Sequence, residues 1–174
     1  QYQNTRSAGF QGWLDEGSLL ISTRFGDTAQ IHRVSQPLGA REQLTFYREP
    51  VNGAAVRPGK SGSGFVFAKD NGGSEFYQLH YYDLGSRQVR RLTDGESRNE
   101  GALWSQDGAQ LAYSSTLRNG QDTDIWVRGL DGEPKLVVQA GGFWAALDFS
   151  PDGRTLLVAQ YIAVDDARPG EVDL

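Results

Sequence analysis

The sequence predicts an all-β chain made of repeats of about 45 residues. The segment WSQDG, which begins at Trp104, returns as FSPDG at Phe149. In both copies an Asp-Gly pair lies between apolar runs, which is the strongest local signal for a β-hairpin. The 22 glycines and 38% hydrophobic residues in 174 residues are typical of a turn-rich globular domain. Repeats of this length with four strands each predict the blades of a β-propeller.

The clearest repeat covers residues 98–138. It begins with an apolar run, continues through a Ser-Gln-Asp-Gly turn into an alternating strand, and reaches two further strands after a polar loop. The four strands are expected at residues 100–104, 110–114, 124–127 and 135–138.

Other copies precede and follow this repeat. The chain is expected to contain blades at residues 1–46, 51–93 and 98–138, and a truncated blade at residues 143–164. Residues 165–174, with Arg168-Pro169-Gly170, are expected to form a charged irregular tail. The predicted fold is therefore a partial β-propeller of about three and a half four-stranded antiparallel blades.

The repeated segments also resemble a known family. WSQDGAQLAYSS, DIWVRGLDG and FSPDGRTLLV resemble TolB-type propeller repeats, and this resemblance covers nearly the whole chain. The same repeat builds the propeller that precedes the α/β-hydrolase domain in the prolyl oligopeptidase and dipeptidyl peptidase family of serine peptidases. The opening segment TRSAGFQGWLDEGSLLISTRF looks like the first blade of such a bacterial peptidase.

The resemblance implies a non-catalytic segment that covers the hydrolase site of a peptidase and controls the access of peptide substrates. The alternative is a stand-alone TolB-like propeller for protein–protein interactions in the bacterial envelope. A third interpretation is a propeller enzyme that acts on sugars, which would need two facing carboxylates on inner strands; the sequence offers only Glu100.

The chain itself is not expected to supply catalytic residues. A serine nucleophile needs a nearby base, but His32 and His80 occupy equivalent positions of two repeats, which favours a structural role. No G-x-S-x-G motif is present, so the peptidase triad would lie outside this segment. Gly59-Lys60-Ser61 resembles the end of a phosphate-binding loop, but Ala54 stands where that motif needs glycine.

No cofactor or metal site is expected either. Acidic residues recur at turn positions, where Asp caps its own backbone; a loose Ca²⁺ site at Asp122 and Asp124 is the weak exception. The tryptophans are explained by packing: Trp13 and Trp104 are predicted to be core residues just before the turn, and Trp126 and Trp144 to pack from strands.

Residues just before the turns of inner strands are the candidates for lining the central channel. These are Arg6 in the first blade and Arg98, Asn99 and Glu100 in the third. The dipeptidyl peptidase branch holds the substrate amino terminus with a pair of acidic residues on an insertion. The sequence has no Glu-Glu pair, so it does not support that specificity.

Composition limits the partners. The formal charge of −5 and the scattered basic residues argue against nucleic acid, and no apolar stretch is long enough to cross a bilayer. The absence of Met and the start at Gln1 suggest a processed chain or a piece of one. The resemblance favours a periplasmic or secreted location and leaves the cytoplasm open. The expected partners are a peptide substrate of the parent enzyme, and either further blades with a hydrolase domain or a second copy, because a half ring leaves faces uncovered.

Overall fold

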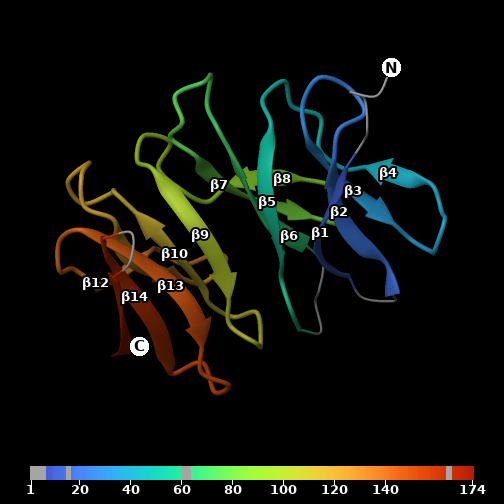
Figure 1. The fold of residues 1–174 in the computed structure, drawn as a ribbon. Coiled ribbons are helices and arrows are strands. Elements are labelled where there is room, and N and C mark those ends of the chain that lie inside the picture. The colour runs from blue at the N-terminus through green and yellow to red at the C-terminus, as the bar shows by residue number, and fades with distance from the viewer. Residues whose placement is uncertain (1–6, 15–16, 60–63, 164–165) are drawn as a thin grey trace.

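The computed structural model describes residues 7–14, 17–59, 64–163 and 166–174 of the chain. In these residues the structure has strands and turns and no α-helix. The strands form four antiparallel sheets that follow one another along the chain, so that the two termini lie at opposite ends of the row (Figure 1). The all-β prediction and the count of about three and a half blades are confirmed.

Each sheet consists of strands that are consecutive in the sequence and paired in chain order. The first sheet contains β1 (Ala8–Trp13), β2 (Leu19–Thr23), β3 (Gln30–Val34) and β4 (Arg41–Gln43). The second contains β5 (Val51–Val56), β6 (Gly64–Lys69), β7 (Gln78–Asp83) and β8 (Val89–Arg91). The third contains β9 (Asn99–Trp104), β10 (Leu111–Ser115), β11 (Asp124–Arg128) and β12 (Lys135–Val138). The fourth contains β13 (Phe143–Phe149), β14 (Thr155–Ala163) and β15 (Asp166–Asp173).

The expectation of an irregular charged tail is wrong. Residues 166–173 form β15, which pairs along nearly the whole length of β14. The Pro169-Gly170 pair suggested a turn, yet Pro169 lies opposite Ala159 in the outermost strand of the sheet. An edge strand tolerates proline because one side of its backbone needs no hydrogen-bond donor. Val172 of β15 packs against the core cluster between the third and fourth sheets.

The repeated Ser-x-Asp-Gly turn is closed by its own side chains. Ser105 Oγ donates to Asp107 Oδ1 (2.7 Å) and accepts from the backbone N–H of Gln110 (2.9 Å). The fourth sheet repeats this arrangement: Ser150 Oγ donates to Asp152 Oδ1 (2.7 Å) and accepts from the Thr155 N–H (2.9 Å). The serine and the carboxylate therefore satisfy turn groups that a strand ladder cannot reach.

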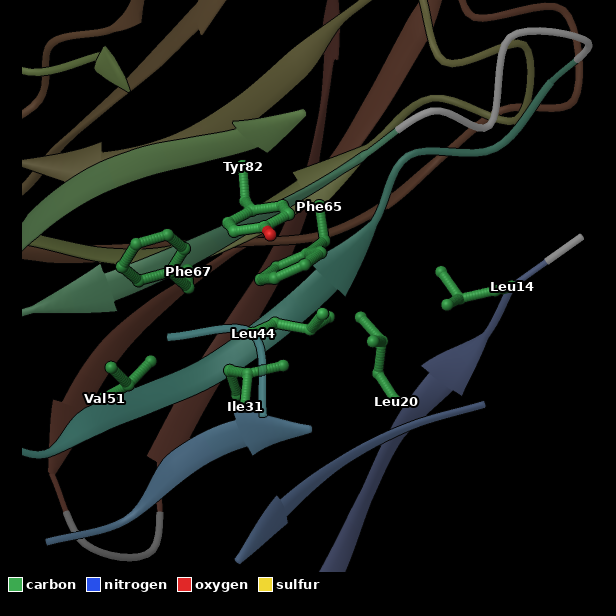
Figure 2. Packing of buried hydrophobic residues seen from close by; sticks show 8 residues of the cluster. All are labelled: Leu14, Leu20, Ile31, Leu44, Val51, Phe65, Phe67 and Tyr82. Atoms are coloured by element: carbon green, nitrogen blue, oxygen red, sulfur yellow. The ribbon is translucent and has the colours of Figure 1, made fainter. Parts of the chain in front are cut away.

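Three apolar clusters fill the spaces between successive sheets. The first lies between the first and second sheets and is drawn in Figure 2; its members are Leu14, Leu20, Ile31, Leu44, Val51, Phe65, Phe67 and Tyr82. Phe65 and Tyr82 stack with ring centroids 5.0 Å apart. Burial of each such side chain stabilises the fold by roughly 1.5–3 kcal/mol, so the sheet-to-sheet contacts are the main source of stability.

The prediction that Trp13 is a core residue is wrong. Trp104 is only 7% exposed because it packs on the second sheet, where its indole N–H donates to Ala55 O (3.2 Å). Trp13 holds the equivalent place on the first sheet and is 64% exposed, since no described sheet precedes it. Trp126 and Trp144 are half-buried, in β11 and β13, and both pack against core clusters.

Candidate functional site on the inner strands

The first strands of the four sheets lie side by side and form the inner wall of the row. β1 contacts β5, β5 contacts β9, and β9 contacts β13. At about the middle of its length, each of these strands carries one extra residue relative to the second strand of its own sheet. The bulges lie at Gln11, Gly53, the Gly101-Ala102 pair and Leu147. A bulge bends the strand and redirects a side chain, and bulges are frequent next to functional sites.

Two of these bulges need glycine. Gly53 and Gly101 have φ of +63° and +67°, in the left-handed region that L side chains avoid. The other two carry side chains: Leu147 is 49% exposed, and Gln11 Oε1 accepts a hydrogen bond from the backbone N–H of Ala54 (2.7 Å). Gln11 thus links the first inner strand to the second.

A cavity of about 270 Å³ opens in the inner wall between β5 and β9. Its floor is apolar, formed by the buried side chains of Val66, Phe67 and Leu79. The walls are formed by alanines and by the two bulge glycines, and Gln11 and Asn52 contribute amide groups at the rim. The inner strands carry small residues around the hollow, which is an apolar pocket with polar groups beside it.

The structure describes three of the four residues proposed for the channel. Arg98 and Glu100 form an ion pair at the start of β9, with Arg98 Nε 2.5 Å from Glu100 Oε1 and side chains 54% and 34% exposed. Arg6 lies outside the described residues. The expectation that Asn99 faces the channel is corrected, because Asn99 is only 1% exposed.

Asn99 has a structural role instead. Its amide nitrogen donates to the backbone carbonyls of Tyr77 (3.0 Å) and Ser97 (2.9 Å). Its amide oxygen accepts from Ser115 Oγ (2.7 Å). These bonds fix the start of β9 against the second sheet. No local pattern distinguishes this buried amide from the half-buried Glu100 beside it.

The two histidines lie in equivalent strands, β3 and β7. Nδ1 of His32 is 3.1 Å from Gln30 O, and Nδ1 of His80 is 3.0 Å from Gln78 O. Burial lowers the pKa of both imidazoles from their usual value, and Arg41 near His32 adds to the effect. Each ring therefore binds the backbone of its own strand in a neutral state.

Lys60 and Ser61 of the phosphate-loop-like segment lie outside the described residues.

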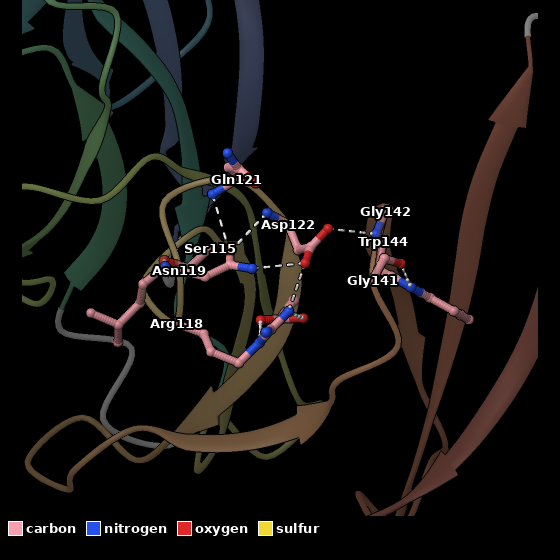
Figure 3. Close-up of polar contacts among 10 residues, drawn as sticks. Ser115, Arg118, Asn119, Gln121, Asp122, Gly141, Gly142 and Trp144 are labelled. Carbon is pink, nitrogen blue, oxygen red and sulfur yellow. Dashed lines mark hydrogen bonds and ion pairs between the residues drawn. The ribbon is translucent and has the colours of Figure 1, made fainter.

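The carboxylates considered for Ca²⁺ hold an arginine instead. Arg118 donates to Asp124 Oδ2 (2.6 Å) and to Asp122 Oδ2 (2.9 Å), as Figure 3 shows around Arg118 and Asp122. Asp122 Oδ1 also accepts from the Gly142 N–H (2.8 Å), which lowers the pKa of this carboxyl and ties the third sheet to the fourth. The guanidinium supplies the positive charge that a cation would bring. No group of three or more metal-ligating side chains is found in the part of the chain that the structure describes.

The arrangement of the sheets defines this chain as part of a β-propeller. No family model matches the chain. An uncharacterised protein of Agrobacterium fabrum is 30% identical over 102 residues, which are 58% of this chain and 34% of that protein. No helix of the described residues is long and apolar enough to span a membrane.

Solved structures place the fold more narrowly. A putative TolB from Agrobacterium tumefaciens matches with a TM-score of 0.73 at 21% identity, over 100% of this chain and 64% of that one. A prolyl endopeptidase, studied for the role of inter-domain dynamics in catalysis and specificity, matches with a TM-score of 0.75 at 17% identity, over 97% and 28%. An oligogalacturonate lyase from Vibrio parahaemolyticus matches with a TM-score of 0.72 at 15% identity, over 92% and 48%. The resemblance to TolB-like and prolyl endopeptidase propellers is therefore confirmed for the fold, and the chain spans less than two thirds of each of these proteins.

Proposed function

We propose that this chain is a non-catalytic propeller segment of a prolyl oligopeptidase-like serine peptidase, where it covers the hydrolase site and controls the entry of peptides. The observation that carries the proposal is the superposition of 97% of the chain on a prolyl endopeptidase. The first-blade resemblance points in the same direction. The chemistry is assigned to residues beyond this segment, because His32 and His80 are tied to backbone carbonyls within their own strands.

The inner wall supplies the contacts for such a filter. The cavity between β5 and β9 has the size and apolar floor for a short aliphatic side chain, and its amide rim suits a peptide backbone. The Arg98–Glu100 pair at the start of β9 and the exposed Leu147 of β13 are the groups that we propose a passing peptide meets. We assign Arg6 the same role by its place in the first repeat.

The test uses the full-length gene product. A fluorophosphonate probe, which reacts with activated serines, is expected to label one serine outside this segment. A short peptide is expected to be cleaved at least tenfold faster than the same sequence inside a folded protein. The variant Leu147→Arg is expected to raise KM for basic peptides and leave kcat unchanged, while Leu38→Arg in an exposed loop serves as the control. A product without a labelled serine would contradict the proposal.

A second function is favoured by one comparison. The 102 matched residues of the Agrobacterium fabrum protein are 34% of its length, so that protein has about 300 residues. This is room for about six or seven blades of this repeat and not for a hydrolase domain. We therefore keep a stand-alone TolB-like interaction propeller as the alternative. It is supported if the full-length product ends after its last blade and captures a partner protein in a pull-down from the cell envelope. For both functions we propose a periplasmic or secreted location.

A further inference from the structure

A second cavity, of about 400 Å³, lies between the second and third sheets. Its lining includes the segment that follows β8, the middle of β10 and the end of β11, and it shares no residue with the cavity in the inner wall. The sheets on both sides of it belong to the described residues, so this hollow is formed within the chain itself. Its volume is in the range of cavities that hold small molecules.

Tyr113 places a hydroxyl group at this cavity where other repeats carry apolar side chains. Phe67 and Val158 hold the same register position in the second strands of their sheets. Each of the three side chains is only 1% exposed. The Tyr113 hydroxyl has no hydrogen-bond partner among the described residues. Because a buried polar group without a partner lowers stability, phenylalanine would suit the fold better here, and the hydroxyl needs a partner from outside the chain.

Two charged side chains line the same cavity. Arg128 Nε donates to Gly129 O (3.2 Å) and Nη1 donates to Leu92 O, and no carboxylate of the described residues forms an ion pair with this guanidinium. Asp94 is exposed; its Oδ1 accepts from Ser97 Oγ (2.6 Å), and its Oδ2 accepts from the Ser97 N–H (3.2 Å). Both charged groups therefore keep unused hydrogen-bonding capacity at the wall of the cavity.

The Tyr113 hydroxyl is within electrostatic reach of both charges. Burial raises the pKa of Tyr113 to about 12, and the charges of Arg128 and Asp94 shift this pKa in opposite directions. The phenol is thus neutral at physiological pH and can both donate and accept a hydrogen bond. Another part of the wall is apolar, formed by the buried Leu92 and the exposed Leu117.

This combination of groups favours a ligand that carries both charges. An anion bound to Arg128 would share the cavity with the carboxylates of Asp94 and Glu133, and a cation bound to Asp94 would share it with the guanidinium. An α-amino acid carries a carboxylate and an ammonium group a short distance apart, so it can make a charge-assisted hydrogen bond at each place. An aliphatic side chain on that amino acid would match the apolar part of the wall.

We propose that the cavity between the second and third sheets binds a free α-amino acid with an aliphatic side chain. The ligand carboxylate accepts from Arg128 and from the Tyr113 hydroxyl, and the ligand ammonium donates to Asp94. The aliphatic side chain contacts Leu92 and Leu117. The site is separate from the inner wall, so it is present whether the whole protein is a peptidase or an interaction propeller.

Isothermal titration calorimetry of the full-length gene product with L-leucine tests the site. Leucine is expected to bind with a dissociation constant of about 1 mM or below. Leucinamide lacks the carboxylate and 4-methylpentanoate lacks the ammonium, so each is expected to bind more weakly by about tenfold or more. Glucose is polar but uncharged and is expected not to bind. Absence of leucine binding in the millimolar range, or binding of glucose in its place, would overturn the proposal.

Three variants locate the bound leucine. Tyr113→Phe removes only the hydroxyl group and is expected to weaken leucine binding by about tenfold or more, while the unfolding temperature of the ligand-free protein stays the same or rises. Asp94→Asn keeps an oxygen for Ser97 and is expected to weaken leucine binding to a similar extent, without weakening that of 4-methylpentanoate. Tyr82→Phe is the matched control, since it removes a hydroxyl from a side chain that is 5% exposed in the preceding repeat, and it is expected to bind as the wild type does. If Tyr113→Phe and Asp94→Asn also keep the wild-type affinity, leucine binds elsewhere and this cavity holds only water.

Discussion

Trp104 and Trp13 hold equivalent positions in two repeats, and their surroundings decide what each contributes. Trp104 fills the space between the second and third sheets. Its ring meets the Tyr81 ring edge to face, with centroids 6.4 Å apart, and the Arg57 guanidinium lies over the Trp104 ring at 5.4 Å. The repeat pattern in the sequence identified both positions correctly. The pattern could not show that a neighbouring sheet covers only one of the two tryptophans, because the burial of each side chain depends on the preceding repeat and not on the repeat that contains it.

This pair yields a prediction on stability. Trp104→Ala is expected to lower the free energy of unfolding by about 3–5 kcal/mol, through lost packing and the loss of the indole hydrogen bond to Ala55 O. Trp13→Ala is the control and is expected to lower it by less than about 0.5 kcal/mol, since its side chain is largely exposed. Urea unfolding at low protein concentration measures both. Equal effects of the two substitutions would contradict the assignment.

His32 makes the stability of the first sheet depend on pH. The ring is 1% exposed, Nε2 has no hydrogen-bond partner among the described residues, and burial lowers the pKa of the imidazole. The unfolded chain therefore takes up a proton at higher pH than the folded chain does, so stability falls as the pH drops below about 6.5.

The corresponding measurement compares urea midpoints at pH 7.5 and 5.5. The wild-type midpoint is expected to fall, and His32→Asn is expected to reduce this fall. His80→Asn serves as a comparison with a smaller effect, because the ring of His80 is only half-buried. If the midpoint of the wild type stays constant over this range, His32 is not held neutral by the fold.

At the scale of the elements, the Asp-Gly turns of the third and fourth sheets differ in what lies above them. Gly108 and Gly153 both have φ of +68°. A Cβ at Gly108 would lie 2.1 Å from the carbonyl oxygen of Pro58, which follows β5 in the second repeat. A Cβ at Gly153 would lie 3.4 Å from the flexible end of the Gln110 side chain. One turn is therefore in tight contact with the backbone of the preceding repeat and the other is not.

Both Gly→Ala variants are expected to lose about 1–2 kcal/mol for the left-handed backbone. Gly108→Ala is expected to lose a further 1–3 kcal/mol or so, because the Pro58 backbone must move. Thermal and urea unfolding of the two variants measure the difference directly. Variants of equal stability would show that the approach of Pro58 to the turn is not tight.

Arg118 balances the charge of a buried carboxylate in the third sheet. Asp124 is fully buried, and its charge is balanced by the guanidinium of Arg118. Arg118→Ala is expected to lower the free energy of unfolding by about 3 kcal/mol, since it leaves a buried carboxylate without a partner.

The control for this variant is Arg87→Ala. Arg87 pairs with Glu42 at the surface, where its side chain is 67% exposed, and its removal is expected to cost less than about 1 kcal/mol. Urea unfolding compares the two. If Arg118→Ala lowers the free energy of unfolding no more than the control does, water solvates the Asp124 carboxylate in place of the guanidinium.

The elements themselves were largely predictable from the sequence. Hairpin turns, alternating strands and the repeat step placed the sheets, because each of these signals is local. β15 was missed since its Pro-Gly pair is typical of a turn, and only pairing with β14 overrides that preference. The bulges were missed as well, because an extra residue in one strand is defined by the register of its partner. The buried amide of Asn99 is likewise a property of three strands and not of one.

At the scale of the whole molecule, the repeated turn carboxylates make the chain sensitive to acid. Hydrogen bonds from the Ser105 and Ser150 hydroxyls lower the pKa of Asp107 and Asp152, and the Gly142 N–H lowers that of Asp122. These carboxylates stabilise the fold while they are ionised. The stability they provide is lost as the pH falls below their ordinary pKa of 3.8 towards the lowered values.

The double variant Asp107→Asn/Asp152→Asn tests this dependence. The urea midpoint of the wild type is expected to fall steeply between pH 4.5 and 2.5, and that of the variant to start lower and to change less. Circular dichroism records both series. Parallel curves would assign the acid sensitivity to other groups.

The bulge in each inner strand has a consequence for how such a protein diverges. At Gly53 and Gly101 the backbone angle restricts the residue, so these two places are closed to most mutations. Gln11 and Leu147 occupy the same structural position without that restriction. Natural variation or a saturation library can therefore change the chemistry of the wall at two of its four bulges while every sheet keeps its register. Selection for new ligands has a ready starting point there.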